Sequence, residues 1–498
     1  MKNRKIGKDA AKITFSEIFT LSISLVSAML LSRFRTLEEY GTYSQILLVT
    51  NLVSTIFMLG LPNSINYFLS RAKNDDERSK FLSTYYTLST ILGFLIGLVL
   101  ILSSQLIVNY FDNPMLNSFI YTFALFPWAR IIISSLSRVL IIYNKSNHLI
   151  LFQVLNGLSL LSIIIFVRLF NLSFAIYMLL FIVIEVLFSL TVYLIIKKIS
   201  AKLYFLFDRK YLMNIFAFSI PIGLASMVGT INKELDKIII GHFFSTEEMA
   251  IFSNSAKELP VTFIANAFIA VVLPVIIMFV QKKKFDKAID LWKDTIFVSF
   301  AFLAFFSLGI FVFAPEVITL LYSVKYLPGV SVFRVYAIVL LLRFTYFGII
   351  LNALGKTKFI LYSSIGALIL NVILNYLFYY TFGFIGPAVA TLVSVLIMQF
   401  LQLLVSAKLT NFSLSKIFPW KQMFIIFIFN VILGIIMWYT KIIVSLEVYI
   451  GDIFESIILG IIWGVVFFSI YFKSLQKKWF RLNDIKIDNL VEIEGEVL

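Results

Sequence analysis

The sequence contains no cysteine and only two histidines, His148 and His242. The absence of cysteine excludes disulfide bonds, thiol nucleophiles and thiolate-bound metals. The two histidines stand too far apart in the sequence to indicate a metal cluster. No Gly-x-x-x-x-Gly-Lys phosphate loop occurs, which argues against direct use of ATP. We therefore expect neither a metal nor a cofactor.

Charge is also scarce, because charged residues make up 14% of the 498 residues whereas hydrophobic residues make up 60%. A water-soluble core cannot hide that much apolar surface, so lipid must cover part of it. Unbroken apolar runs, such as residues 174–184 and 457–468, fit membrane helices and not the alternating strands of a barrel. The composition predicts an all-α membrane protein and excludes soluble enzymes and nucleic-acid readers.

About fourteen apolar stretches approach the ~20 residues that a helix needs to cross a ~30 Å hydrocarbon layer. We place these spans at 13–33, 43–64, 82–110, 116–141, 149–170, 173–196, 214–242, 252–281, 295–315, 330–352, 358–381, 384–406, 422–440 and 453–472. No connection between them is long enough to form a separate soluble domain. Prolines at positions 62, 127, 221, 260 and 274 stand within spans and are expected to permit bends.

The basic residues predict the orientation of the bundle. The N-terminus and alternate connections hold thirty lysines and arginines, whereas the opposite connections hold five. Under the positive-inside rule the basic side is cytoplasmic, and an even number of spans puts both termini there. The net charge of +15 is therefore a topology signal and no sign of nucleic-acid binding.

A weak internal repeat divides the chain. Residues 38–44, EEYGTYS, recur as EEMAIFS at residues 247–253. We predict two related halves with the same orientation, as in duplicated transporters. The expected organisation is an N-terminal lobe at 1–200 with spans one to six and a C-terminal lobe at 201–410 with spans seven to twelve. Spans thirteen and fourteen occupy 411–473, and 474–498 form a cytoplasmic tail.

One connection carries an amphipathic pattern. Phe285, Ile289 and Trp292 follow each other at helical spacing between basic residues. The pattern predicts a short helix that rests on the inner membrane surface. A solvated basic turn that anchors the topology is the alternative.

Several charged residues fall inside predicted spans, where each costs about 2.5–3.5 kcal/mol unless it faces a wet cavity, pairs or reaches an edge. The proposed cavity cations, and hence substrate-binding residues, are Arg130, Lys233, Lys237, Lys257 and Arg334. Glu17, Asp236 and Glu258 are candidates for ion coupling. Because basic residues outnumber acidic ones, we expect an anionic cargo, and the fork of arginine suits a phosphate.

Structural alternatives remain for these charges. The segment from Lys233 to Lys237 also contains Glu234 and Asp236, so it is either part of a cavity or a self-neutralised ladder of ion pairs. Arg138, Arg334 and Glu258 are close enough to span ends or opposite charges to reach an interface or a partner. Glu185 is either a hydrogen-bonded group of the bundle or a functional carboxylate.

The sequence resembles a known family in two regions. Ser219-Ile220-Pro221-Ile222-Gly223-Leu224, Asn232-Lys233-Glu234-Leu235-Asp236-Lys237, Ala250-Ile251-Phe252-Ser253 and Ala256-Lys257-Glu258-Leu259-Pro260 resemble segments of polysaccharide repeat-unit flippases, of the O-antigen and capsule type. Leu31-Ser32-Arg33-Phe34, Glu39-Tyr40-Gly41-Thr42-Tyr43 and Gly60-Leu61-Pro62-Asn63 resemble the first two spans of the same proteins. These flippases belong to the multidrug/oligosaccharidyl-lipid/polysaccharide exporter superfamily.

The resemblance implies two six-helix lobes around a central cavity, with two further helices. It also implies a cargo of undecaprenyl-diphosphate-linked oligosaccharide, moved across the bacterial cytoplasmic membrane for lipopolysaccharide or capsule synthesis. A polysaccharide polymerase is an expected partner. No covalent chemistry is expected, so the chain is not read as an enzyme. Two alternatives are kept. A multidrug cation antiporter of the same superfamily would need an acidic cavity to bind its cargo. A membrane polysaccharide polymerase or ligase would carry a large outer loop with catalytic residues.

Overall fold

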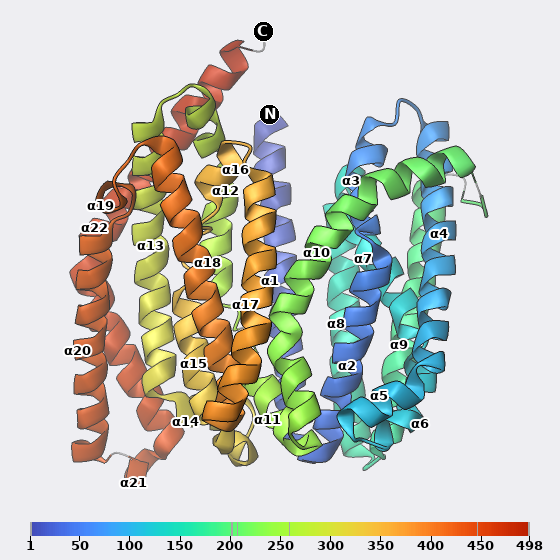
Figure 1. Cartoon of the computed structure of the whole chain (residues 1–498), viewed down its shortest axis with the longest axis horizontal. Helices are drawn as coiled ribbons and strands as arrows, with labels where there is room; N and C mark the ends of the chain where they lie inside the picture. The colour runs from blue at the N-terminus through green and yellow to red at the C-terminus, as the bar shows by residue number, and fades with distance from the viewer. Residues whose placement is uncertain (1, 201–202, 207, 258, 446, 497–498) are drawn as a thin grey trace. The chain divides into compact units, whose positions relative to one another are not determined.

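The structure is a computed structural model that describes residues 2–200, 203–206, 208–257, 259–445 and 447–496. Within these ranges it describes the side chains of all but residues 2–15, 210 and 483–496. The regular structure in the described residues is entirely helical (Figure 1). The chain divides into two compact units, Met1–Ser253 and Asn254–Leu498, which are described one by one.

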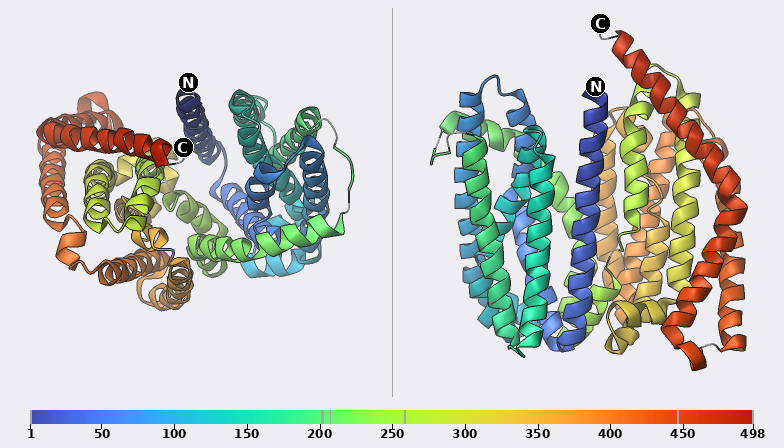
Figure 2. Two further views of the ribbon diagram at one scale, coloured as in Figure 1. Left: turned by 90° about the horizontal axis from the view of Figure 1, so that it is seen from above. Right: turned by 180° about the vertical axis from the view of Figure 1, so that it is seen from behind.

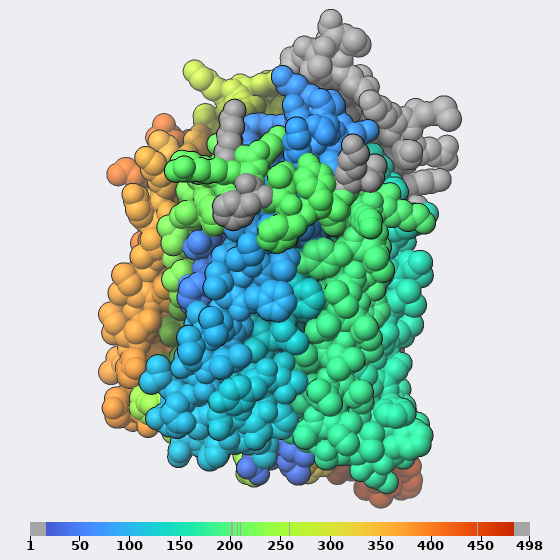
Figure 3. Space-filling model, turned by 90° about the vertical axis from the view of Figure 1, so that its right-hand side faces the viewer, coloured from blue at the N-terminus to red at the C-terminus, as the bar shows by residue number. Residues whose placement is uncertain are grey.

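The first unit contains ten helices and most of an eleventh in the described residues. They are α1 (Lys2–Phe34), α2 (Leu37–Met58), α3 (Leu61–Arg71), α4 (Asp75–Leu102), α5 (Ser104–Phe111), α6 (Met115–Phe123), α7 (Phe126–Ile142), α8 (Ser146–Leu169), α9 (Phe174–Ile199), α10 (Arg209–Phe243) and α11 (Thr246–Ser255). One face of this unit is covered by α4, α5, α6 and α9 (Figure 3). Leucines such as Leu102 and Leu194 are largely exposed on these helices, as expected of surfaces in contact with lipid.

The second unit follows the same all-helical plan in its described residues. It contains α12 (Thr262–Gln281), α13 (Phe285–Val312), α14 (Ala314–Leu321), η1 (Val324–Gly329), α15 (Val330–Leu341), α16 (Ile349–Ala353), α17 (Thr357–Phe382), η2 (Gly383–Ile385), α18 (Gly386–Thr410), α19 (Leu414–Ile417), α20 (Trp420–Val444), α21 (Glu447–Ile450) and α22 (Asp452–Glu496). Helix α13 lies at its centre and packs against α12, α15, α20 and α22.

The described helices account for the predicted spans. Eleven continuous segments are long and apolar enough to cross a membrane, and the pairs α2–α3 and α6–α7 each form one further span with bends of 45° and 47°. One of the eleven, Thr357–Thr410, contains both α17 and α18, which run side by side in Figure 1. Counted separately, these helices bring the described residues to fourteen spans, and the predicted all-α membrane fold is confirmed.

Two of the five prolines lie at the bends. Pro62 and Pro127 stand in the first turns of α3 and α7, where a missing backbone N–H costs no helical hydrogen bond. Pro221 and Pro274, in contrast, lie inside the continuous helices α10 and α12. The bend before Pro62 also contains Leu59 and Gly60 with positive φ angles of 47° and 71°, a backbone shape that glycine adopts without steric cost.

The bend between α2 and α3 is held against α10 by two glycines. A Cβ on Gly60 would lie 2.6 Å from the backbone nitrogen of Gly223, and a Cβ on Gly223 would run into the backbone of Leu59 and Gly60. Only glycine allows the two backbones to approach this closely. Two of the sequence segments that carry the family resemblance therefore touch each other at this crossing.

The helices of the two repeated segments, α2 and α11, begin with the same N-terminal capping arrangement. Thr36 caps α2 by accepting from the N–H of Glu39, whose carboxylate accepts from the N–H of Thr36. Before α11, Ser245 and Glu248 make the same two bonds, 209 residues later in the chain. Each pair is a capping box, which fixes the first residue of its helix.

The capped ends of α2 and α11 also meet, because a Cβ on Gly41 would run into the backbone of Thr246. The two segments thus lie at the same end of the first unit.

The connections of each unit alternate between its two ends. In the first unit, the start of α1, the α3–α4 connection and the start of α10 lie at one end, with α5 and α6 near the other (Figure 1). In the second unit, the α12–α13 and α16–α17 connections lie at the end from which α22 extends, opposite α14 and α21 (Figures 1 and 2). The backbone of α22 stays helical to Glu496, beyond the span predicted to end at 472.

The predicted surface helix at residues 285–292 is wrong. These residues form the first two turns of the 28-residue helix α13, and Ile289 and Trp292 are buried in the core of the second unit. The indole N–H of Trp292 donates to the hydroxyl of Thr345 at 2.8 Å. These residues do form an apolar face of a helix, as predicted. However, this face is covered by other residues of the second unit and not by lipid.

Candidate functional site

Arg130 lies on an exposed position of α7 in the first unit. Its guanidinium carbon is 5.6 Å from the centre of the Phe126 ring on the same helix. The Arg130 charge also acts on Glu185 of α9, a residue that is only 1% exposed and has one carboxylate oxygen without a hydrogen-bond partner. Arg130 thus presents a cation at the surface of the helix bundle, above a buried carboxyl group.

The charged segment of α10 contains one ion pair and one buried carboxylate. Lys237 pairs with Glu234 at 2.6 Å, and both side chains are 21% exposed. Asp236 is 1% exposed, its Oδ1 accepts from the backbone N–H of Lys237 at 2.8 Å, and its Oδ2 has no hydrogen-bond partner. Lys233 is exposed. The ladder alternative therefore holds for Glu234 and Lys237.

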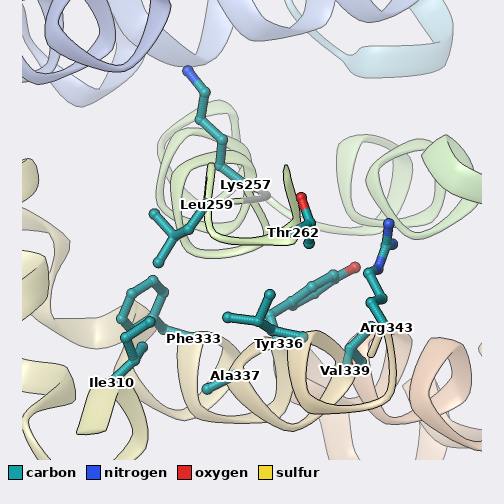
Figure 4. Close-up of a pocket in the computed structure, with 10 residues that line it drawn as sticks. Lys257, Leu259, Thr262, Ile310, Phe333, Tyr336, Ala337, Val339 and Arg343 are labelled. Carbon is teal, nitrogen blue, oxygen red and sulfur yellow. The ribbon is translucent and has the colours of Figure 1, made fainter. Parts of the chain in front are cut away.

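A pocket in the second unit has two cations in its lining. It lies between the segment that precedes α12 and one side of α15 (Figure 4). Its polar lining comprises Lys257, Thr262, Tyr336 and Arg343, and its other walls are aliphatic or aromatic. Figure 4 shows that the charged ends of Lys257 and Arg343 both point away from Phe333, in different directions. An apolar pocket whose lining includes cations suits an amphipathic anion.

Arg334 does not line this pocket. Its Nε donates to the carbonyl oxygen of Phe311 at 3.2 Å, and its guanidinium lies 5.6 Å from the centre of the Phe311 ring. Arg343, which was not among the predicted binding residues, occupies the pocket because α15 ends at Leu341 and the chain turns there. The sequence showed that the two arginines, nine residues apart, lie on different helical faces, but it could not show which face borders a pocket.

The three ion-coupling candidates differ in their surroundings. Glu17 is exposed on α1, Asp236 is buried, and Glu258 lies outside the described residues. Among the described charged residues within the predicted spans, those that are exposed or line the pocket are mainly cations. The carboxylates of Glu185 and Asp236 are buried, and that of Glu234 is paired with Lys237. The accessible charge on these membrane helices is therefore mostly positive.

Comparison with known proteins assigns the chain to a family. Residues 30–331 match the model of a family described as "Polysaccharide biosynthesis protein". The chain belongs to this family. An uncharacterized membrane protein of Methanocaldococcus jannaschii, MJ1068, is 25% identical over 442 residues, which cover 82% of each chain. The family assignment agrees with the resemblance found in the sequence.

Solved structures show what fold this family member has. The lipid II flippase MurJ in an inward closed conformation matches with a TM-score of 0.72 and 17% identity, over 93% of this chain and 98% of MurJ. An inward-facing multidrug resistance MATE transporter of the MOP superfamily matches with a TM-score of 0.62 and 15% identity, over 79% of this chain and 96% of the transporter. The family member is a multi-pass membrane protein that shares the fold of these two solved structures.

Proposed function

We propose that the protein is a flippase that moves undecaprenyl-diphosphate-linked oligosaccharide repeat units across the bacterial cytoplasmic membrane for surface polysaccharide synthesis. The observation that carries this proposal is the accessible positive charge on membrane helices of a polysaccharide-biosynthesis family member, at Arg130, Lys233 and the pocket with Lys257 and Arg343. A diphosphate needs such cations, because moving it through a low-dielectric layer without them is costly.

The proposed mechanism is alternating access without covalent chemistry. The basic residues bind the diphosphate and any acidic sugar, while the lipid chain stays in the bilayer. In this proposal residues 1–200 and 201–410 are the two related lobes around a central cavity, and rocking of one against the other exposes that cavity to each side in turn. Both termini are proposed to be cytoplasmic, and a polysaccharide polymerase is the expected downstream partner.

Within the proposed cavity, the residues contribute unequally. Arg130, Lys233 and Lys257 are retained as ligands, and Arg343 is added because it shares the pocket with Lys257. Lys237 and Arg334 are proposed to act less directly, since one is paired with Glu234 and the other is bound to the carbonyl oxygen of Phe311.

A multidrug cation antiporter would use accessible carboxylates to bind its cargo. Of the described carboxylates within predicted spans one to twelve, Glu17 is exposed, Glu185 and Asp236 are buried, and Glu234 is paired with Lys237. This distribution favours an anionic cargo over a cationic one.

Asp236 is the proposed ion-coupling residue, because it combines burial with an oxygen that has no hydrogen-bond partner. Replacing a buried, poorly satisfied carboxylate by its amide removes a desolvation cost. We expect Asp236→Asn to leave thermal stability unchanged or higher while transport loses its dependence on the proton or sodium gradient. Unchanged ion dependence in a stable variant would remove Asp236 from this role, and the exposed Glu17→Gln is the matched control.

The function itself is tested by deletion of the gene and by complementation. We expect lipid-linked repeat units to accumulate on the cytoplasmic leaflet of the mutant, and the intact gene to restore their passage and the surface polysaccharide. Normal polysaccharide with no accumulation, in a strain without other flippases, would contradict the proposal.

A further inference from the structure

A second pocket lies at the end of the first unit where α1 and α8 finish and α9 begins. Its lining contains none of the residues proposed above as cargo ligands. Helices α1 and α8 pack against each other, so their last turns form two walls. Leu31, Ile164 and Val167 are buried and line an apolar part of the pocket, and Arg35 and Arg168 supply two cations.

The concentration of arginine here is unusual for this side of the chain. The predicted outer connections contain only Arg33, Arg35, Arg168, Lys325 and Lys441 as basic residues. Three of these five belong to the last turn of α1, the residues after it and the last turn of α8. Since topology selects against basic residues on this side, the position of Arg35 and Arg168 in the lining of one pocket indicates a binding role.

The guanidinium of Arg35 is held in a fixed orientation by its neighbours. Its side chain is 13% exposed, one Nη donates to the carbonyl oxygen of Leu172 at 3.1 Å, and the other lies 3.9 Å from the carboxylate of Glu39. The guanidinium also lies 6.0 Å from the centre of the Phe174 ring. These contacts fix the orientation of the fork, although Glu39 offsets part of its charge. A fixed guanidinium loses little conformational entropy when it binds an anion.

Arg168 supplies the second, more accessible charge. It is exposed, and its guanidinium lies 5.3 Å from the centre of the Phe34 ring across the pocket. Its neighbours on α8 are strongly exposed apolar residues, with Leu169 at 72% and Phe170 at 63%. These residues place Arg168 where lipid-facing surface ends, which is the depth of the phosphate groups of a bilayer.

We propose that this pocket binds the phosphate headgroup of a membrane lipid. Arg35 and Arg168 take the phosphate, and the apolar wall of Leu31, Ile164 and Val167 takes the first part of the lipid chain. The exposed apolar border at Leu169 and Phe170 favours a lipid over a soluble phosphate, because only a lipid gains from contact with it. Under the orientation proposed above, the site faces the outer leaflet; the binding itself does not depend on that orientation or on flippase activity.

The absence of native cysteine allows a local test. A fluorophore attached to Leu169→Cys in the full-length protein would report the lipids beside the pocket, in phosphatidylcholine vesicles that contain phosphatidic acid with brominated chains. We expect stronger quenching than by brominated phosphatidylcholine at the same content. Arg168→Gln should weaken the apparent affinity for phosphatidic acid about tenfold, the effect of losing one charge-assisted hydrogen bond.

Arg33→Gln is the matched control, because it removes the same charge from the same end of α1 without lining the pocket. Equal effects of Arg33→Gln and Arg168→Gln would overturn the site in favour of a general surface charge. Displacement of the brominated lipid by added pyrophosphate would overturn the lipid assignment and leave a soluble anion as the ligand. Since Arg168 makes no hydrogen bond among the described residues, its substitution should not disturb folding, and a thermal unfolding measurement verifies this.

Discussion

Two regions of the molecule place charged side chains among apolar helices and use them in opposite ways. In the C-terminal part, Lys441 of α20 pairs with Glu316 and, at 2.5 Å, with Asp452. Further along, Asp294 of α13 pairs with Lys478 and, at 3.3 Å, with Arg481, both of α22. These ion pairs join helices to each other.

On α7, on α10 and in the pocket of the second unit, cations are accessible instead. Arg130 and Lys233 occupy exposed positions, and Lys257 and Arg343 line a pocket. The comparison shows that the same residue types in membrane helices join helices in one region, and occupy exposed positions or line a pocket in the other. Stability and transport should therefore respond separately to substitutions in the two regions.

The largest effect on stability is expected from Lys478→Met combined with Arg481→Met. Both changes keep apolar stems but leave the carboxylate of Asp294, which is 7% exposed, without its partners. Removing the partners of a buried charge costs about 3–5 kcal/mol. The measurement is thermal unfolding of the purified protein in detergent.

The matched control for this variant is Lys473→Met combined with Lys477→Met, which removes two exposed charges from the same helix and should have little effect. Adding Asp294→Asn to the first variant should restore much of the lost stability. Equal destabilisation by both double variants would mean that the charge of α22, and not its pairing with α13, holds the helix.

The next effect concerns transport. Lys257→Ala and Arg343→Ala each remove a cation from the pocket of the second unit, and a charge-assisted hydrogen bond contributes roughly 1.5–3 kcal/mol. We therefore expect about a ten- to hundredfold loss of transport at unchanged expression, measured as surface polysaccharide in a strain that lacks the gene. Lys293→Ala is the control, because Lys293 pairs with Asp290 at 3.5 Å. Full transport by both pocket variants would exclude this pocket from the pathway.

The fold was largely predictable from the sequence because the length of each apolar run determines whether a helix can cross the bilayer. Hydrophobic helices must cross the bilayer whatever their neighbours are, so the fourteen predicted spans reappear with shifted ends. The exceptions lie where tertiary packing decides. Trp292 was read as membrane-surface aromatic, but its environment is set by Thr345, a residue 53 positions away.

The candidate site was less predictable for a similar reason. Composition identifies a charge inside a span, but not whether a carboxylate or a carbonyl from another helix meets it. Arg334 is bound by the carbonyl oxygen of Phe311, and Arg343 lines a pocket because α15 ends two residues earlier. Neither fact follows from helical periodicity. The arginines of the outer pocket were noted only as topology signals, since their convergence depends on how α1 packs against α8.

A smaller effect should distinguish charge from geometry at Arg130. Arg130→Lys keeps the positive charge but loses the planar fork that binds two phosphate oxygens at once. If one hydrogen bond of about 1 kcal/mol is lost, transport should fall about fivefold, less than in Arg130→Ala. Surface polysaccharide at equal expression measures this order. Full activity of Arg130→Lys would show that charge alone suffices, and loss of expression would indicate a structural role beside Glu185.

The smallest effect is expected where the two uses of charge meet, at Glu234 and Lys237 on α10. Glu234→Gln breaks their 2.6 Å ion pair, and a pair at this spacing on a helix contributes only about 0.2–0.5 kcal/mol. The unfolding temperature should hardly change. Transport should stay within about twofold, because the positive charge of Lys237 is retained, whereas Lys237→Ala should lower it. Loss of expression in the Glu234→Gln variant would instead show that this ion pair stabilises the fold, as the ion pairs between α13, α20 and α22 do.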